Sequence, residues 1–313
     1  MGAYIAGRVF STLIVMAIVG LIVFLLLHLA PGSPAAIIAG DNATPAQIAL
    51  INHELGLDKP LPVQFGIWAW SIVRGQFGTS IFSGVPVIEL IEQRLPATVS
   101  LTFITMAFAA TLAVTAGVLA AWRAGGTLDR TLMGIAALGF SVPVFVVGYF
   151  LIYLFAIVLH WLPVQGYEPL SRGFWPWLSH LILPALALGL AYLALIARIT
   201  RASVLEVLSE DYMRTARAKG ASTRSQLFHH ALRNAGVPIA TVIGIGVALL
   251  ISGVVLTETV FNIPGIGRLT VDAITNRDYP IIQGVMVVFS GAYVIINLLV
   301  DLSYTLIDPR IRR

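Results

Sequence analysis

Residues 96–121 read PATVSLTFITMAFAATLAVTAGVLAA, with no Asp, Glu, Lys, Arg or His among them. A helix needs about 20 mostly apolar residues to cross a bilayer core about 30 Å thick, and this stretch is long enough. The stretch Thr131–Leu159 is uncharged throughout as well. Runs of this kind are typical of transmembrane helices, whereas a membrane β-barrel shows alternating segments of about ten residues.

The composition of the whole chain agrees with a membrane protein. Of its 313 residues, 58 % are hydrophobic and 11 % are charged, and the mean hydropathy is +0.90. A soluble domain carries about 25 % charged residues, so the composition excludes a soluble globular protein, and the high apolar content excludes disorder. The sequence contains no cysteine, which excludes disulfides, thiolate metal sites and cysteine nucleophiles.

Six stretches are long and apolar enough to cross a membrane. They are Val9–Ala30, Pro96–Ala121, Thr131–Leu159, Leu178–Ala197, Val237–Glu258 and Ile281–Leu306. We therefore predict an all-α integral membrane protein with six transmembrane helices. Residues 1–30 form a tail and the first helix, residues 31–95 an extracytoplasmic loop subdomain, and residues 96–313 a five-helix core that contains a cytosolic loop, 198–236.

The distribution of basic residues predicts the orientation of the chain. Cytoplasmic loops carry an excess of Lys and Arg, and most of the 19 such residues fall in the tail, in alternate loops and at the C-terminus. We therefore expect both termini in the cytoplasm. The long loop 31–95 then lies outside, where Thr44-Pro45-Ala46-Gln47 predicts a helix start and Val63–Arg74 a second, amphipathic helix.

The loop 198–236 holds seven basic and three acidic residues, a balance equal to the net charge of +4 of the whole chain. Its pattern predicts one short helix over Asp211–Ala218, closed by Gly220. A second helix capped by Ser222 ends near Asn234. Such an element suits the docking of a cytosolic partner, although a basic loop that only sets the orientation is an equally good interpretation of the residues alone.

The chain has no energy source or catalytic site of its own that we recognise. A P-loop needs Gly-Lys followed by Ser or Thr, but Lys59 and Lys219 are followed by Pro and Gly. We expect no enzyme, no metal site and no bound cofactor. A proton-coupled carrier would place an ionisable group near the bilayer midplane, and the spans nearly lack such groups, which leaves sodium coupling open.

Weakly polar and helix-bending residues inside the spans predict the lining of a translocation pathway. The residues we assign to it are Ser141, Pro143, Ser252, Thr257 and Glu258. Ordinary helix packing would explain any single one of them.

The stretch Asp211–Gly220, DYMRTARAKG, resembles the cytosolic loop of permease subunits from bacterial ABC importers, as does His230–Ala235, HALRNA. The chain resembles the dipeptide, oligopeptide and nickel branch in particular, and its long outer loop resembles the B-type permease of a pair. Further matches follow in order: residues 28–32 (HLAPG), 55–58 (LGLD), 258–261 (ETVF), 264–267 (PGIG), 277–280 (RDYP) and 308–310 (DPR).

The chain departs from the general family pattern at three places. The family loop begins Glu-Ala-Ala, whereas Arg214 and Thr215 stand at the first two positions and Ala216 matches. The loop ends His-Ala-Leu-Arg instead of Ile-x-Leu-Pro, and Ser33 stands where Asp is expected. The first two departures resemble the peptide branch.

The resemblance implies the type I ABC importer permease fold and a coupling helix that sits in a groove of an ATPase subunit. The coupling residues carried over by position are Arg214, Thr215, Ala216, Arg217, Ala218, Lys219 and Gly220. The small side chains of Ala216 and Ala218 would let the helix lie close to the ATPase subunit, and Gly220 would allow the turn. Arg217 and Lys219 would pair with acidic groups.

The resemblance also implies the partners of the chain. They are a second homologous permease, two P-loop ATPase subunits that bind ATP and Mg, an extracytoplasmic substrate-binding protein, and the lipid bilayer of the bacterial inner membrane; no nucleic acid is expected. The implied function is ATP-driven import of di- and oligopeptides, with this chain forming half of the pathway. An ion-coupled secondary transporter, or an importer of nickel, glutathione or haem-like cargo, are the alternatives.

Overall fold

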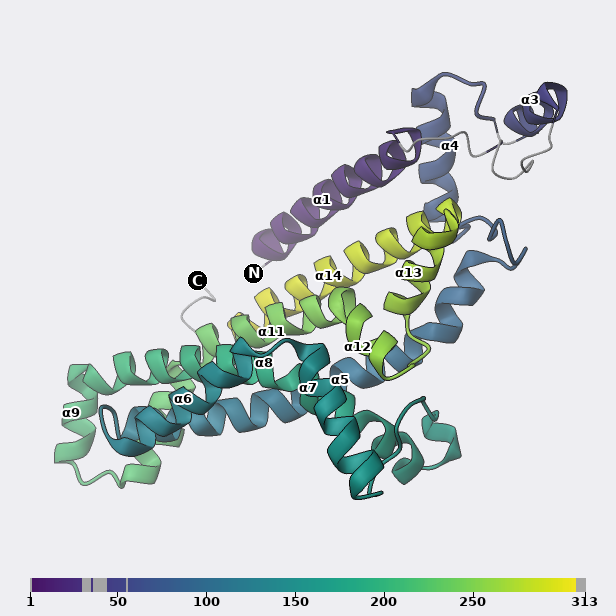
Figure 1. The fold of residues 1–313 in the computed structure, drawn as a ribbon. Helices are drawn as coiled ribbons and strands as arrows, with labels where there is room; N and C mark the ends of the chain where they lie inside the picture. Colours follow the sequence, from purple (N-terminus) through teal and green to yellow (C-terminus); the bar gives the residue numbers. More distant parts are fainter. Residues whose placement is uncertain (1, 30–34, 36–43, 55, 308–313) are drawn as a thin grey trace.

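The computed structural model describes residues 2–29, 35, 44–54 and 56–307 (Figure 1). The motif residues 30–33, 55 and 308–310 lie outside these ranges. The chain is helical: α1 (Gly2–Leu29), α3 (Pro45–Glu54), α4 (Leu61–Val73), α5 (Val87–Trp122), α6 (Thr127–Ser141), α7 (Val144–Leu151), α8 (Phe174–Ser209), α9 (Asp211–Ala218), α10 (Leu232–Asn234), α11 (Gly236–Gly253), α12 (Val255–Val260), α13 (Ile266–Asn276) and α14 (Tyr279–Ile307).

Short irregular helices complete the chain. Two π-helical segments, η1 (Ile152–Val158) and η3 (Ser225–Ala231), continue neighbouring α-helices, and η2 (Leu170–Arg172) is a 3₁₀ turn. In the described ranges the only β-type pairing is an isolated antiparallel bridge between Thr79 and Pro86. The all-α class predicted from the sequence is therefore confirmed.

Helices α5 and α8 pack along each other and form the centre of the bundle. Small residues let them approach closely, as is usual for helices in a membrane. A Cβ built on Gly117 of α5 would lie only 2.6 Å from the Cβ of Thr200 in α8, and one on Gly189 of α8 would lie 3.0 Å from the Phe108 ring. The main apolar core runs along this contact and includes side chains of α11.

The two central helices extend well past the apolar runs from which they were predicted. Helix α5 begins at Val87, and α8 continues to Ser209. Polar residues do not end a helix once it has left the hydrocarbon, because water and side chains can solvate them there. The boundary predicted between residues 95 and 96 consequently falls inside α5, and the extracytoplasmic subdomain is not confirmed as a separate unit.

The third apolar stretch is not the single helix that its composition suggests. It divides into α6 and α7, which are bent by 98° across Val142 and Pro143, and Figure 1 shows α7 turning away from the α5–α8 axis. Proline fixes its own φ and disfavours a helical conformation in the preceding residue, and Val142 is extended with ψ 129°. The expected bend at Pro143 is present, and it is far sharper than a kink.

The fifth apolar stretch is also broken. Helix α11 ends at Gly253, and α12 begins at Val255. At its other end, the segment Ser225–Asn234 meets Gly236–Ile251 at 64°. In the described residues three unbroken helices, α5, α8 and α14, can cross a membrane, or five if each bent pair is one span. The predicted count of six is therefore not confirmed.

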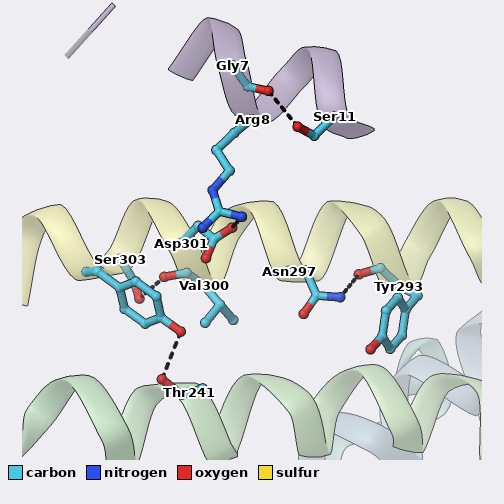
Figure 2. A network of polar contacts seen from close by, with 10 residues as sticks. Gly7, Arg8, Ser11, Thr241, Tyr293, Asn297, Val300, Asp301 and Ser303 are labelled. Carbon is cyan, nitrogen blue, oxygen red and sulfur yellow. Dashed lines mark hydrogen bonds and ion pairs between the residues drawn. The ribbon is translucent and has the colours of Figure 1, made fainter. Parts of the chain in front are cut away.

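Helix α1 lies beside α14 at the edge of the bundle (Figure 1). Figure 2 shows the ion pair between them, in which Arg8 Nη1 lies 3.2 Å from Asp301 Oδ2. On its other side α14 meets α11, where the hydroxyls of Thr241 and Tyr304 lie 2.8 Å apart. Helix α4 packs on the far end of α1, with the Trp68 and Phe24 ring centroids 5.8 Å apart.

The close approach of α5 and α8 predicts the effect of a single methyl group. Gly117→Ala should lower the thermal unfolding midpoint, because overpacking of this kind costs about 1–3 kcal/mol. Gly134→Ala on α6 is the matched control, since a Cβ there meets nothing within 4 Å and alanine favours a helix over glycine by about 1 kcal/mol. Tryptophan fluorescence of the purified variants in detergent measures the unfolding midpoint of each. Equal midpoints for the two variants would contradict this packing.

Candidate functional site: helix α9 and its polar supports

The predicted cytosolic helix is present with the predicted bounds, Asp211–Ala218, and forms α9. It follows α8 after one extended residue, Glu210, and lies at one end of the bundle (Figure 1). Gly220 has φ +81°, the left-handed conformation that ends a helix without strain when the residue is glycine. Ala221 N then donates to Ala216 O at 3.1 Å and reverses the chain.

Helix α9 has one buried side and one exposed side. Met213 is fully buried, and Ala216 is half-buried. The remaining predicted coupling residues are all exposed: Arg214, Thr215, Arg217, Ala218, Lys219 and Gly220. Met213 therefore anchors the helix to the bundle, while the basic residues and Ala218 face outward.

The second predicted helix packs behind α9. Ser225 N donates to Ser222 Oγ at 3.3 Å, which is the expected cap, and the helical segment ends at Asn234. Gln226 joins the two halves: its Nε2 donates to Ala221 O at 2.7 Å, and its Oε1 accepts from Arg217 Nε at 3.4 Å. The hairpin is therefore held by hydrogen bonds as well as by packing.

An apolar cluster fixes the hairpin to the bundle. Leu227 and Ala231 of η3 are buried against Val118 of α5 and Val204 of α8. The exposed side keeps its charge, because the one ion pair of α9 itself, between Arg214 and Asp211 at 3.3 Å, joins two strongly exposed side chains. Exposed pairs of this kind contribute little. The result is a basic surface on a well-anchored support.

The sequence reasoning missed a second support, an ion pair between Asp129 and Arg201. Arg201 Nε and Nη2 each donate to one oxygen of the Asp129 carboxylate at 2.6 Å. The backbone N of Gly125 adds a third donor at 2.8 Å. In the sequence Arg201 is one of the basic residues of the loop 198–236, and Asp129 lies 72 positions away, so no local pattern links them.

The predicted pathway residues fall in two places. Ser141 and Pro143 are exposed at the break between α6 and α7, and the Ser141 hydroxyl donates to Ala137 O of its own helix at 2.9 Å. Thr257 and Glu258 are buried in α12. Within the described part of the chain no hydrogen bond joins the two places. Ser252 belongs to α11, but its side chain lies outside the described part. Their assignment to a pathway stays a prediction.

Glu258 is fully buried and forms the hub of a hydrogen-bond network. Thr98 Oγ1 of α5 donates to Glu258 Oε1 at 2.7 Å, and the backbone N of Arg268 donates to Oε2 at 2.9 Å. Thr98 Oγ1 in turn accepts from the backbone N of Ile266 at 2.9 Å. The carboxylate thereby satisfies orphan amides in the first turn of α13 and ties α12 and α13 to α5.

This network explains the motif Pro264-Gly265-Ile266-Gly267. A Cβ on Gly265 would lie 1.9 Å from Glu258 Oε1, and one on Gly267 would lie 3.0 Å from Oε2. Only glycine leaves room for the carboxylate at the first of these positions. The motifs ETVF and PGIG are therefore two halves of one structural unit.

The other end of α13 is held by a second buried carboxylate. Arg277 takes the left-handed conformation with φ +56° and ends α13. Asp278 follows, and its Oδ2 accepts from Ser80 Oγ at 2.6 Å in the loop before α5. The RDYP motif thus contributes a buried anchor between this loop and α14.

An apolar groove of about 400 Å³ lies between α5 and α11. Its lining residues are Val99, Thr102, Phe103, Met106, Ala107, Ala110, Val247 and Ile251. Thr102 is buried, and its hydroxyl has no hydrogen-bond partner among the described residues. The same residues contain no group of three or more His, Cys, Asp or Glu side chains that could hold a metal ion.

Comparison with known proteins places the chain in a family. A family model described as the binding-protein-dependent transport system inner membrane component matches residues 113–313, and a model of the N-terminal part of such membrane components matches residues 1–102. The chain belongs to this family of transporter membrane components. The resemblance found in the sequence motifs is thereby confirmed.

Individual relatives share nearly the whole length of the chain. A protein of Sinorhizobium fredii named "Probable peptide ABC transporter permease protein" is 65 % identical, over 100 % of both chains. A glutathione transport system permease protein of Shigella flexneri is 44 % identical, over 99 % of this chain and 98 % of its own. A solved inward-facing structure of the MetNI methionine ABC transporter has a similar fold, with a TM-score of 0.58 and 17 % identity, over 71 % of this chain and 97 % of that chain.

The Glu258 network of this membrane component predicts that replacing Thr98 of α5 lowers stability more than replacing Thr115 of the same helix. Thr98→Val keeps the shape of the side chain but leaves the Ile266 amide and a carboxylate oxygen each short of one partner, which costs about 1–3 kcal/mol. The unfolding midpoint of the purified protein should fall accordingly. Thr115→Val is the matched control, because the Thr115 hydroxyl is exposed and donates only to Thr111 O of its own helix. A Thr98→Val protein as stable as the control would show that the network does not support the fold.

Proposed function

We propose that this chain is the permease subunit of an ATP-driven importer of peptides, that it forms half of the translocation pathway, and that α9 couples it to cytosolic ATPase subunits. Membership of the family supports the permease role, and the names of the relatives support the class of substrate. The observation that carries the coupling role is the geometry of α9, a short basic helix anchored by buried Met213 and open to a partner on its other side.

The residues of α9 suit docking into an acidic groove. Ala216 and Ala218 are small enough to let a partner surface approach the helix backbone closely. Arg217 and Lys219 are exposed cations that can pair with carboxylates of the ATPase subunit. Gly220 closes the helix and lets the chain return to the bundle. ATP and Mg bind to the partner ATPase subunits in this proposal.

The complete transporter contains a second homologous permease, two ATPase subunits and an extracytoplasmic substrate-binding protein. In our proposal the bent pair α6–α7 makes one crossing and α11 another, and together with α1, α5, α8 and α14 they give six. Both termini and α9 then lie in the cytoplasm of a bacterial cell, and α3, α4 and α13 lie outside. The positive-inside rule supports this orientation.

We infer the substrate class from the names of the relatives. The relative of 65 % identity is named for peptides, and the one named for glutathione, itself a tripeptide, is less similar at 44 %. Peptide import is therefore favoured over the glutathione alternative. Membership of a binding-protein-dependent transport family argues against the ion-coupled carrier.

Charge reversal on α9 tests this function. Arg217→Glu should weaken the binding of the ATPase subunits by about tenfold or more, because like charges placed against each other cost several kcal/mol. Membrane insertion should be intact, and uptake of radiolabelled peptides into vesicles that contain the whole transporter should fall with the loss of binding. Copurification of the ATPase subunits and uptake are the two measurements.

The matched control is Arg74→Glu, the same charge change on an exposed residue at the end of α4, which lies at the other end of the bundle from α9 (Figure 1). It should leave binding and uptake unchanged. If the ATPase subunits still copurified with the Arg217→Glu protein and uptake were normal, α9 would not be the docking helix. Uptake driven by an ion gradient without ATPase subunits would overturn the transporter class.

A further inference from the structure

Helix α8 is longer than a bilayer crossing requires. Its 36 residues span about 54 Å at about 1.5 Å each, against a hydrocarbon core of about 30 Å. The apolar run ends at Ala197, and about three more turns lead from Arg198 to the turn before α9. We name residues 198–218, these turns together with α9, the coupling arm.

The Asp129–Arg201 ion pair lies at the base of the coupling arm. The side chain of Asp129 is 5 % exposed and that of Arg201 is 29 % exposed, so the pair is largely removed from water. The paired geometry, with two parallel N–H donors on one carboxylate, fixes direction as well as distance. It connects the first turn of α6 and the loop before it to the arm.

Helix α6 contributes no residue to the apolar cluster at the base of the arm. That cluster draws its buried members from α5, α8, η3 and α11, and from Ala235 between η3 and α11. The apolar packing of α6 on α8 lies farther from the arm, with Met133, one turn after Asp129, against the main core and Gly139 against Leu190. At the base of the arm the directional link between α6 and α8 is therefore the ion pair.

Helix α6 connects the arm, through α7, to the end of α12. It ends at the sharp break before α7, and α7 packs against the end of α12. A Cβ on Gly148 of α7 would lie 3.2 Å from the Phe261 ring, three residues after the Glu258 hub. A displacement of α6 can therefore reach α12 and, through Glu258 and Thr98, the groove-lining helix α5.

We propose that Asp129 and Arg201 are positioning residues that fix α6 to the coupling arm, so that a movement of α9 driven by the ATPase subunits is transmitted to α6 and α7. The proposal rests on the coupling role of α9 proposed above. Without the pair, the arm would still dock on the ATPase subunit, but its movement would be taken up at the base and would not reach α6.

Distances between nitroxide labels test this directly, because the sequence contains no cysteine. Labels at Leu138→Cys on α6 and Ser209→Cys at the end of α8 occupy exposed positions. Pulsed spin-resonance measurements on the whole transporter in lipid nanodiscs give the distance without nucleotide and with ATP plus vanadate. We expect the same distance in both states in the otherwise unmodified chain, because α6 and the arm move together.

Asp129→Asn should make this distance change when ATP is added, and the uptake of peptide per ATP hydrolysed should fall about fivefold or more. Arg201→Lys keeps the charge but loses the planar fork, so it should give an intermediate effect, and it preserves the test if Asp129→Asn fails to fold. Arg130→Gln is the matched control. It removes the exposed cation next to Asp129 on α6, which lies outside the arm and forms no ion pair with a described residue, and it should behave as the unmodified chain.

A third label, at the exposed Thr223→Cys just beyond the turn that follows α9, separates the two proposals. If it becomes immobile when ATPase subunits are added, yet the α6–arm distance of Asp129→Asn and Arg201→Lys is unaffected by ATP, the role of the ion pair is overturned and the docking of α9 stands. If the Thr223 label stays mobile in every protein, the docking of α9 fails, and the role of the pair fails with it.

Discussion

A buried charge without partners is too costly for a folded protein, and this constraint decides where the few charges of the chain lie. Among the described residues the buried carboxylates are those of Asp129, Glu258 and Asp278. Each accepts hydrogen bonds from a different part of the chain: Arg201 in α8, Thr98 in α5, and Ser80 in the loop before α5. Each of these carboxylates therefore links elements that are distant from one another in the sequence.

Apolar and polar contacts therefore contribute differently to the fold. Apolar packing holds the long helices together but specifies their relative position loosely, since it has no direction. The carboxylates add direction at points where short elements must be held. Glu258 and Asp278 fix the two ends of α13, and Asp129 fixes α6 to the coupling arm. Only 11 % of the residues are charged, and several of these link helices that are distant in the sequence.

The features predicted correctly from the sequence are those set by local interactions. The bounds of α9, the turn at Gly220 and the cap at Ser222 depend on residues within a few positions of one another. The same holds for the start of α3, where Thr44 N donates to Gln47 Oε1 at 2.8 Å. The apolar runs of α5, α8 and α14, likewise, needed only composition to be recognised as helices that can cross a membrane.

The features that the sequence did not predict depend on distant residues or on the environment of a helix. The Thr98–Glu258 bond joins residues 160 positions apart, and no periodicity signals it. The 98° break at Val142–Pro143 is sharper than the kink that proline predicts, and α7 packs beyond it against α8 and α12, which are distant in the sequence. The extra turns of α8 were assigned to a loop, since their polarity excludes a span but not a helix.

The central claim is that α9 is the surface on which the ATPase subunits act. Hydrogen–deuterium exchange of the chain in nanodiscs, with and without the ATPase subunits, measures this at the level of the backbone. We expect slower exchange over residues 211–224 when the subunits are present and no change over α4, which lies at the other end of the bundle in Figure 1. Equal exchange over residues 211–224 in the two samples, with the complex assembled, would contradict the account.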